Sequence, residues 1–299
     1  MFHAIAEMIQ TAEENHQPLW EAVVDAEIIE SQQPRAAILA NMTRRLEVMR
    51  RSTEQGLQTP IRSLSGMSDG NAHRFWSWLQ KKDAQPITGS LLSRAVARAL
   101  AVGEINACMG CIVATPTAGS AGILPAVLLT LQEAYQKSDE DVVHALFTAG
   151  GIGAVIVHRA HVSGAAGGCQ AETGSAAAMS AGATVELLGG SPRQVSHAVA
   201  ITLTNMLGLV CDPVAGLVEV PCIQRNAGGV AQAFLSSDLA LAGIESLIPA
   251  DEVIDAMERV GQRLDERLRE TALGGLAATP TGKELAQRIW GRKTPSEGA

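Results

Sequence analysis

The sequence predicts an all-α protein, a single helical domain in which buried central helices rich in Ala and Gly are wrapped by amphipathic helices. The first observation is composition: the 299 residues include 47 Ala but only 9 aromatic residues, and Ala is the strongest helix former. The second is charge, because only 9 of the 23 basic and 31 acidic residues fall within residues 105–210. The third is that no stretch alternates apolar and polar residues between turn signals, as a half-buried strand would.

The first half of the chain is expected to pass from surface helices into the core. Two amphipathic helices come first, with apolar residues at helical spacing. Their apolar positions are Phe2, Ile5, Ile9 and Ala12, then Ile38, Met42, Leu46 and Met49. The charge-poor middle follows, and its longest apolar run, residues 145–157, is shorter than the roughly 20 residues of a membrane span. We therefore expect a buried helix there rather than a membrane segment.

The last third is expected to return to surface helices. An apolar stripe consists of Val253, Met257, Val260, Leu264 and Leu268. Ser191 to Gln194 reads as a capping box with Pro192 at the first helical position, and Thr281 to Glu284 fits the same box. We expect residues 1–291 to form the domain and residues 292–299 to form a flexible C-terminal tail.

Charge and chain ends exclude several classes of function. The net charge is −8 and no dense basic cluster occurs, which argues against a nucleic-acid partner. The first residues lack the basic and continuous apolar regions of an export signal, so we expect a cytoplasmic protein that is not membrane-bound. Five cysteines at irregular spacing in such a protein indicate metal binding, catalysis or burial rather than disulfides.

The cysteines are the strongest candidates for chemistry. Cys108 and Cys111 have the C-x-x-C spacing used by zinc, redox and cluster sites, but no second pair completes a zinc site. Cys169 ends a glycine-rich loop, Cys211 precedes Asp-Pro, and Cys222 follows a proline. Glycine allows close backbone approach and proline fixes a rigid corner. From spacing alone, a metal role and burial as small hydrophobic side chains both stay open.

Five motifs narrow this choice. They are NACMG (106–110), ATPTAGSAG (114–122), SGAAGGCQAE (163–172), NMLGLVCDPVAGLVEVPC (205–222) and GGLAATPTG (274–282). Together they resemble the α subunit of bacterial iron–sulfur-dependent L-serine dehydratase, an L-serine ammonia-lyase, from the first helix to about residue 291. The resemblance implies that Cys169, Cys211 and Cys222 hold a [4Fe–4S] cluster. It leaves Cys108 and Cys111 as packed thiols.

The resemblance also implies an activity and a partner. The family converts L-serine to pyruvate and ammonia by β-elimination, a step of serine catabolism that needs no pyridoxal phosphate (PLP). Three thiolates leave one iron of the cluster open as a Lewis acid for the departing hydroxyl. The five lysines lie in polar stretches rather than in an apolar core, where the pKa of a Schiff-base lysine would be lowered. The family's carboxylate-binding and histidine loops belong to a β subunit and are absent here, so we expect a β-subunit partner and an oligomer.

Other polar residues complete the predicted site. Glu172 is the candidate acid–base group of this chain, because an isolated carboxylate in an uncharged region must be paired, hydrogen-bonded or functional. The general base is otherwise unassigned and is expected on the β subunit. Candidate substrate-binding residues are Thr117, Gly119, Ser120, Asn205 and Asn226. Their alternative roles are a tight turn between buried helices and helix capping.

Two other functions stay open at this point. A related cluster-dependent lyase, such as an L-cysteine desulfidase, would eliminate sulfur in place of hydroxide. A non-catalytic helical redox sensor would use Cys108 and Cys111 as a switching dithiol. A dithiol switch would be colourless, whereas a bound cluster would make the protein brown.

Overall fold

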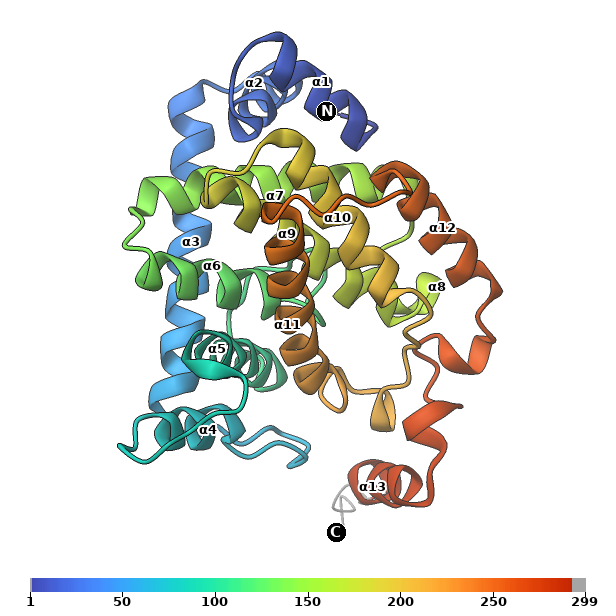
Figure 1. Cartoon of the computed structure of the whole chain (residues 1–299). Coiled ribbons are helices and arrows are strands. Elements are labelled where there is room, and N and C mark those ends of the chain that lie inside the picture. The colour runs from blue at the N-terminus through green and yellow to red at the C-terminus, as the bar shows by residue number, and fades with distance from the viewer. Residues whose placement is uncertain (1, 292–299) are drawn as a thin grey trace.

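The computed structural model describes residues 2–291, which fold into thirteen α-helices (Figure 1). Within these residues there is no β-strand, only two isolated β-bridges, so the predicted all-α class is confirmed. The predicted tail, residues 292–299, lies outside the described residues. The helices are α1 (Ile5–Glu14), α2 (Leu19–Ser31), α3 (Arg35–Gln58), α4 (Asn71–Leu79), α5 (Gly89–Ala107), α6 (Ile123–Ala134), α7 (Asp139–Arg159), α8 (Gly164–Gly167), α9 (Ser175–Leu187), α10 (Pro192–Met206), α11 (Cys222–Leu241), α12 (Ala250–Arg263) and α13 (Pro280–Trp290).

Helix α9 is the centre of the fold. All of its residues except Glu186 are buried, and it packs against α6, α7, α10 and α11. Small side chains make this close packing possible. A Cβ atom added at Gly182 would lie 2.3 Å from the Ile152 side chain on α7, so only glycine fits there without a shift. This confirms the predicted Ala- and Gly-rich buried helices.

The amphipathic helices predicted for the two ends surround this core. The long helix α3 runs along one side, and α1 and α2 lie at the opposite end of the molecule from α13 (Figure 1). Ile38, Leu46 and Met49 of α3 are buried, as are Val253 and Met257 of α12.

The end of α12 differs from the prediction. The apolar stripe extends the helix to Leu268, but α12 ends at Arg263 and Leu264 is extended. Asp265 accepts a hydrogen bond from the Arg267 backbone N–H and so starts a 3₁₀ turn. The chain then runs beside Cys211, where the Cys211 N–H donates to the Leu268 carbonyl at 2.8 Å. The tertiary contact therefore overrides the helical periodicity.

Helix starts follow the predicted signals in one of two cases. Ser191 caps α10 in the predicted capping box with Gln194. The box predicted at Thr281 is wrong, because Thr279 caps α13 by accepting from the Gly282 N–H, with Pro280 as first residue. Proline favours the first helical position and so moves the start two residues earlier.

Helix α7 contains the apolar run considered above as a membrane segment. Within the described residues, it is the one helix whose length and composition would permit a membrane span. Its most apolar window is 67% buried inside the fold, against α2, α9 and other helices. This burial agrees with the predicted core helix.

The starts of α2 and α4 are capped by carboxylates from distant segments. Neither α2 nor α4 has a capping side chain of its own. Glu186 of α9 accepts from the Trp20 N–H at 3.2 Å, and Glu104 of α5 accepts from the Asn71 and Ala72 N–H groups at 2.7 and 3.2 Å. A carboxylate stabilises the exposed N–H groups and positive dipole of a helix start.

Glu186 makes the stability of the apoprotein depend on pH. Burial raises its pKa from 4.5 to about 7, despite the opposing hydrogen bonds from Trp20 and Leu19. The folded state therefore binds this proton more tightly than the unfolded state, and the free energy of unfolding falls as pH rises from 4.5 to 7. We expect Glu186→Gln to remove this loss, which amounts to about 3 kcal/mol.

Urea unfolding of both proteins at pH 5 and pH 8 measures this difference. Glu47→Gln, at an exposed position of α3, is the matched control and should keep the pH dependence of the parent chain. Equal pH dependence in Glu186→Gln and the parent would contradict the role of Glu186.

Candidate functional site

Three buried cysteines from separate segments lie close together. Cys169 precedes the π-helical turn Gln170–Gly174, Cys211 follows α10, and Cys222 is the first residue of α11. All three are free thiols with exposed fractions of 3%, 2% and 8%. Burial and the neighbouring Cys169 and Glu172 raise the pKa of the Cys222 thiol to about 12, and that of Cys211 rises for the same reasons. The three thiols thus form one site, called the cysteine site below, in which each would make the ionisation of the others harder without a cation or metal.

The glycine-rich loop lets the segments approach. Ser163 caps the short helix α8, and Gly164 packs directly on Cys211. A Cβ at Gly164 would lie 2.6 Å from the Cys211 Sγ and 2.8 Å from the Glu172 Oε2. Gly168 adopts φ +76°, which L side chains rarely tolerate, and it turns the chain into Cys169.

Backbone pairing holds Cys211 in place on both sides. Besides the bond from its N–H to Leu268, its carbonyl accepts from the Glu270 N–H at 2.7 Å, in an isolated β-bridge with Arg269. The loop between Cys211 and Cys222 is held by α13, because the Trp290 indole donates to the Ala215 carbonyl at 3.0 Å. The segment after α12 and helix α13 therefore position the middle cysteine and its loop.

Glu172 lies beside Cys211 at the edge of the cysteine site. Its Oε1 accepts from the Thr117 hydroxyl at 2.7 Å, and its Oε2 is 4.0 Å from the Cys211 Sγ. Burial raises the pKa of the Glu172 carboxyl, the bond from Thr117 lowers it, and the charge of Glu270 raises it again. A carboxyl group is therefore held within reach of the cysteines by the predicted substrate loop.

The loop of residues 114–122 is tied to the helix that carries Cys222. Buried Asn226 accepts from the Gly122 N–H at 2.9 Å and donates to the Gly119 and Cys222 carbonyls at 2.7 and 2.8 Å. Ser120 is also buried, and its hydroxyl donates to the Thr115 carbonyl at 3.1 Å. These bonds give Asn226 and Ser120 a structural role that holds Thr117 and Gly119 beside Glu172.

Asn205 is placed differently from the other four predicted substrate-binding residues. It is exposed near the end of α10, and no residue among 2–291 hydrogen-bonds to its side chain. The link between this end of α10 and Cys169 is made instead by buried Gln170, whose Oε1 accepts from the Gly208 N–H at 2.9 Å.

Sequence reasoning missed Arg225 and Asp212. Arg225 lies one turn after Cys222 in α11 and forms an ion pair with buried Asp212, with Nη2 2.7 Å from Oδ1. The Asp212 Oδ2 also accepts from the Leu276 N–H at 2.7 Å. Each residue lies within three positions of a predicted ligand cysteine, and this proximity was the available signal.

The comparisons with known proteins agree with this arrangement. Residues 14–277 match the family model of the serine dehydratase alpha chain. The chain is 46% identical over 291 residues to the probable L-serine dehydratase alpha chain of Bacillus subtilis (strain 168), which covers 97% of this chain and 96% of that one. The chain belongs to the serine dehydratase alpha-chain family. The resemblance inferred from the five motifs is thereby confirmed.

Further relatives show two chain lengths in this family. The L-serine dehydratase alpha chain of Peptoniphilus asaccharolyticus is 45% identical over 285 residues, 95% of this chain and 97% of that one. The L-serine dehydratase TdcG of Escherichia coli (strain K12) is 43% identical over 181 residues, which make up 60% of this chain and only 40% of that one. The region shared with TdcG is thus less than half of that longer chain.

The C-x-x-C cysteines have neighbours other than the three buried cysteines. Cys108 directly follows the last residue of α5, and its Sγ donates to the Arg62 carbonyl at 3.3 Å. Cys111 is exposed and lines a separate hollow with Arg45 and Val48 of α3. The two thiols have different neighbours.

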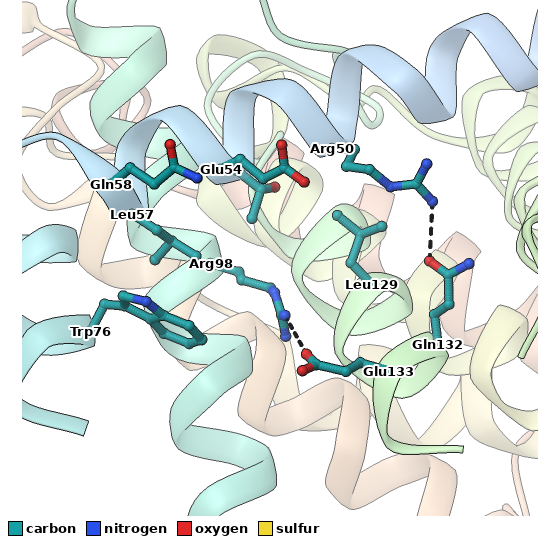
Figure 2. Close-up of a pocket in the computed structure, with 10 residues that line it drawn as sticks. Arg50, Glu54, Leu57, Gln58, Trp76, Arg98, Leu129, Gln132 and Glu133 are labelled. Atoms are coloured by element: carbon teal, nitrogen blue, oxygen red, sulfur yellow. Dashed lines mark hydrogen bonds and ion pairs between the residues drawn. The ribbon is translucent and has the colours of Figure 1, made fainter. Parts of the chain in front are cut away.

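The protein also contains a cavity of about 480 Å³ between α3, α4, α5 and α6. Leu57, Leu129 and Trp76 line it, while Arg98 points to Glu133 and Arg50 to Gln132 (Figure 2). None of the predicted site residues lines this cavity. Arg50 and Arg98 of this cavity are already paired with acidic residues, so we keep the cysteine site as the candidate functional site.

Proposed function

We propose that this chain is the cluster-binding alpha subunit of an L-serine dehydratase, with a [4Fe–4S] cluster on Cys169, Cys211 and Cys222. The observation that carries the proposal is the convergence of three buried free thiols, of which that of Cys211 packs so closely on Gly164 that an added Cβ would overlap its sulfur. Within residues 2–291, no three His, Cys, Asp or Glu side chains are close enough to hold a single metal ion. A four-iron cluster is wider than one ion, so its ligand sulfurs stand farther apart, and the donor set fits it.

The chemistry proposed is β-elimination from L-serine to give pyruvate and ammonia. When bound, the cluster supplies a Lewis-acidic iron without a protein ligand for the departing hydroxyl. Gly119, Thr117 and Glu172 form the adjoining wall, and Thr117 fixes the orientation of the Glu172 carboxyl. Glu172 is the acid–base group of this chain nearest the cysteines.

We propose that the remaining groups come from a β subunit and that no PLP takes part. The motifs for binding the substrate carboxylate and for the base are absent from this sequence, and TdcG, of the same family, has a much longer chain. None of the described lysines is buried (Lys81, Lys82, Lys137 and Lys283). A Schiff-base lysine would need such burial to lower its pKa.

Oxygen-free reconstitution tests this function. We expect the chain to bind about four iron and four sulfide ions, and to form pyruvate and ammonia from L-serine only when a β subunit is added. L-cysteine as the alternative substrate distinguishes a desulfidase. Absence of sulfide in oxygen-free preparations would contradict the cluster, and turnover by the chain alone would place the base on this subunit.

A further inference from the structure

The largely buried guanidinium of Arg225 lies where the three cysteine segments meet. It belongs to the first turn of α11, three residues after Cys222, and 17% of its side chain is exposed. Its Nη1 donates to the Val210 carbonyl at 2.7 Å, next to Cys211. The guanidinium also lies near enough to the Cys169 thiol for each group to favour the charged form of the other. One side chain therefore links the helix of Cys222 to the segment of Cys211 and lies beside Cys169.

Asp212 completes this connection by fixing the guanidinium. A buried cation is costly unless it is paired and hydrogen-bonded. Asp212 provides the pairing at 2.7 Å and is itself held by the Leu276 N–H. Because a guanidinium is planar with donors in several directions, it can serve a carbonyl, a carboxylate and a sulfur at once. A lysine ammonium is a single compact charge on a flexible stem and cannot span all three partners.

We propose that Arg225 is a positioning residue that holds the three cysteines at the spacing of the cluster and donates a hydrogen bond to the Cys169 sulfur. This inference rests on the proposed function. It adds a residue that adjusts the cluster without ligating iron. Hydrogen bonds to ligand sulfurs favour the more negative, reduced cluster and therefore raise its reduction potential.

The test uses the full chain with its β subunit, purified without oxygen, as Arg225→Met and Arg225→Lys. We expect Arg225→Met to lose iron to a chelator about 10- to 100-fold faster than the parent protein, with a lower reduction potential for the cluster that remains. Arg225→Lys keeps the charge, so it should restore part of the potential but not the resistance to the chelator. A purely structural role would change stability without moving the potential.

Arg259→Met on α12 is the matched control, because Arg259 is exposed and none of the described residues pairs with it. It should retain iron and reduction potential like the parent. Thermal unfolding of the apoproteins shows whether Arg225→Met folds. If it does not fold, the chelator resistance and reduction potential of Arg225→Lys test the inference. Chelator resistance and potential equal to the parent in both Arg225 variants would overturn the inference. A parent protein without iron and sulfide would instead overturn the proposed function itself.

Discussion

Replacing Cys211 with serine is expected to abolish binding of the proposed [4Fe–4S] cluster. Cys211 is buried between Gly164 and the Leu268–Glu270 segment, so no exposed thiol can take its place. A serine hydroxyl is a hard and weakly acidic ligand, whereas iron–sulfur clusters are held by thiolates. Iron should fall from about four per chain to below about one. Turnover of L-serine should fall more than about 100-fold, beyond the loss expected for an outer partner of a metal site.

Cys111→Ser is the matched control for this change. Cys111 is exposed and lines a different hollow, so its loss should leave iron, sulfide and activity unchanged. Iron and sulfide analysis after oxygen-free reconstitution measures both variants. A normal iron content in Cys211→Ser would show that Cys211 is not a ligand of the cluster. Loss of iron in Cys111→Ser would instead favour Cys108 and Cys111 as the cluster ligands.

Gly164→Ala is expected to damage the site while sparing the fold. The new methyl group would lie 2.6 Å from the Cys211 Sγ and 2.8 Å from the Glu172 Oε2, so at least one of them must move. Alanine favours the helical conformation of α8, so local stability should not fall through helix propensity. We expect about 10- to 100-fold lower activity with L-serine, together with reduced iron content.

Gly228→Ala tests whether the position matters rather than the residue type. Gly228 lies in α11 with no neighbouring heavy atom within 4 Å of an added Cβ. It should keep the parent's iron and activity and stabilise the helix by about 0.5–1 kcal/mol. Steady-state kinetics and thermal unfolding of the two variants provide the comparison. Full activity and iron in Gly164→Ala would show that the contact with Cys211 is not needed.

Most of the fold could be predicted because its signals are local. Ala-rich composition and the spacing of Ile38, Leu46 and Met49 depend on neighbours along the helix, and the structure confirms both. The errors arise where distant contacts decide. Cys211 pairs with Leu268, so the chain leaves the α12 helix before the apolar stripe ends.

The candidate site, too, was predicted correctly in some parts and not in others. Motifs of the sequence identified the three cysteines, Glu172 and the loop of residues 114–122 as one group, and they lie together in the structure. Asn205 belongs to the same motif as Cys211 but faces outward. A motif shows which residues share a segment, and the direction of each side chain depends on helix rotation within the packed core.

The sequence by itself therefore determined the all-α class, the buried small-residue centre and the family. Only the tertiary structure revealed that Arg225 links the helix of Cys222 to the segment of Cys211 and that Glu104 and Glu186 cap helices elsewhere in the chain. Helix periodicity and motifs act over a few residues, so they can be read along the chain. A buried charge must find its partners wherever packing brings them, and those partners lie beyond the few residues that a helical pattern covers.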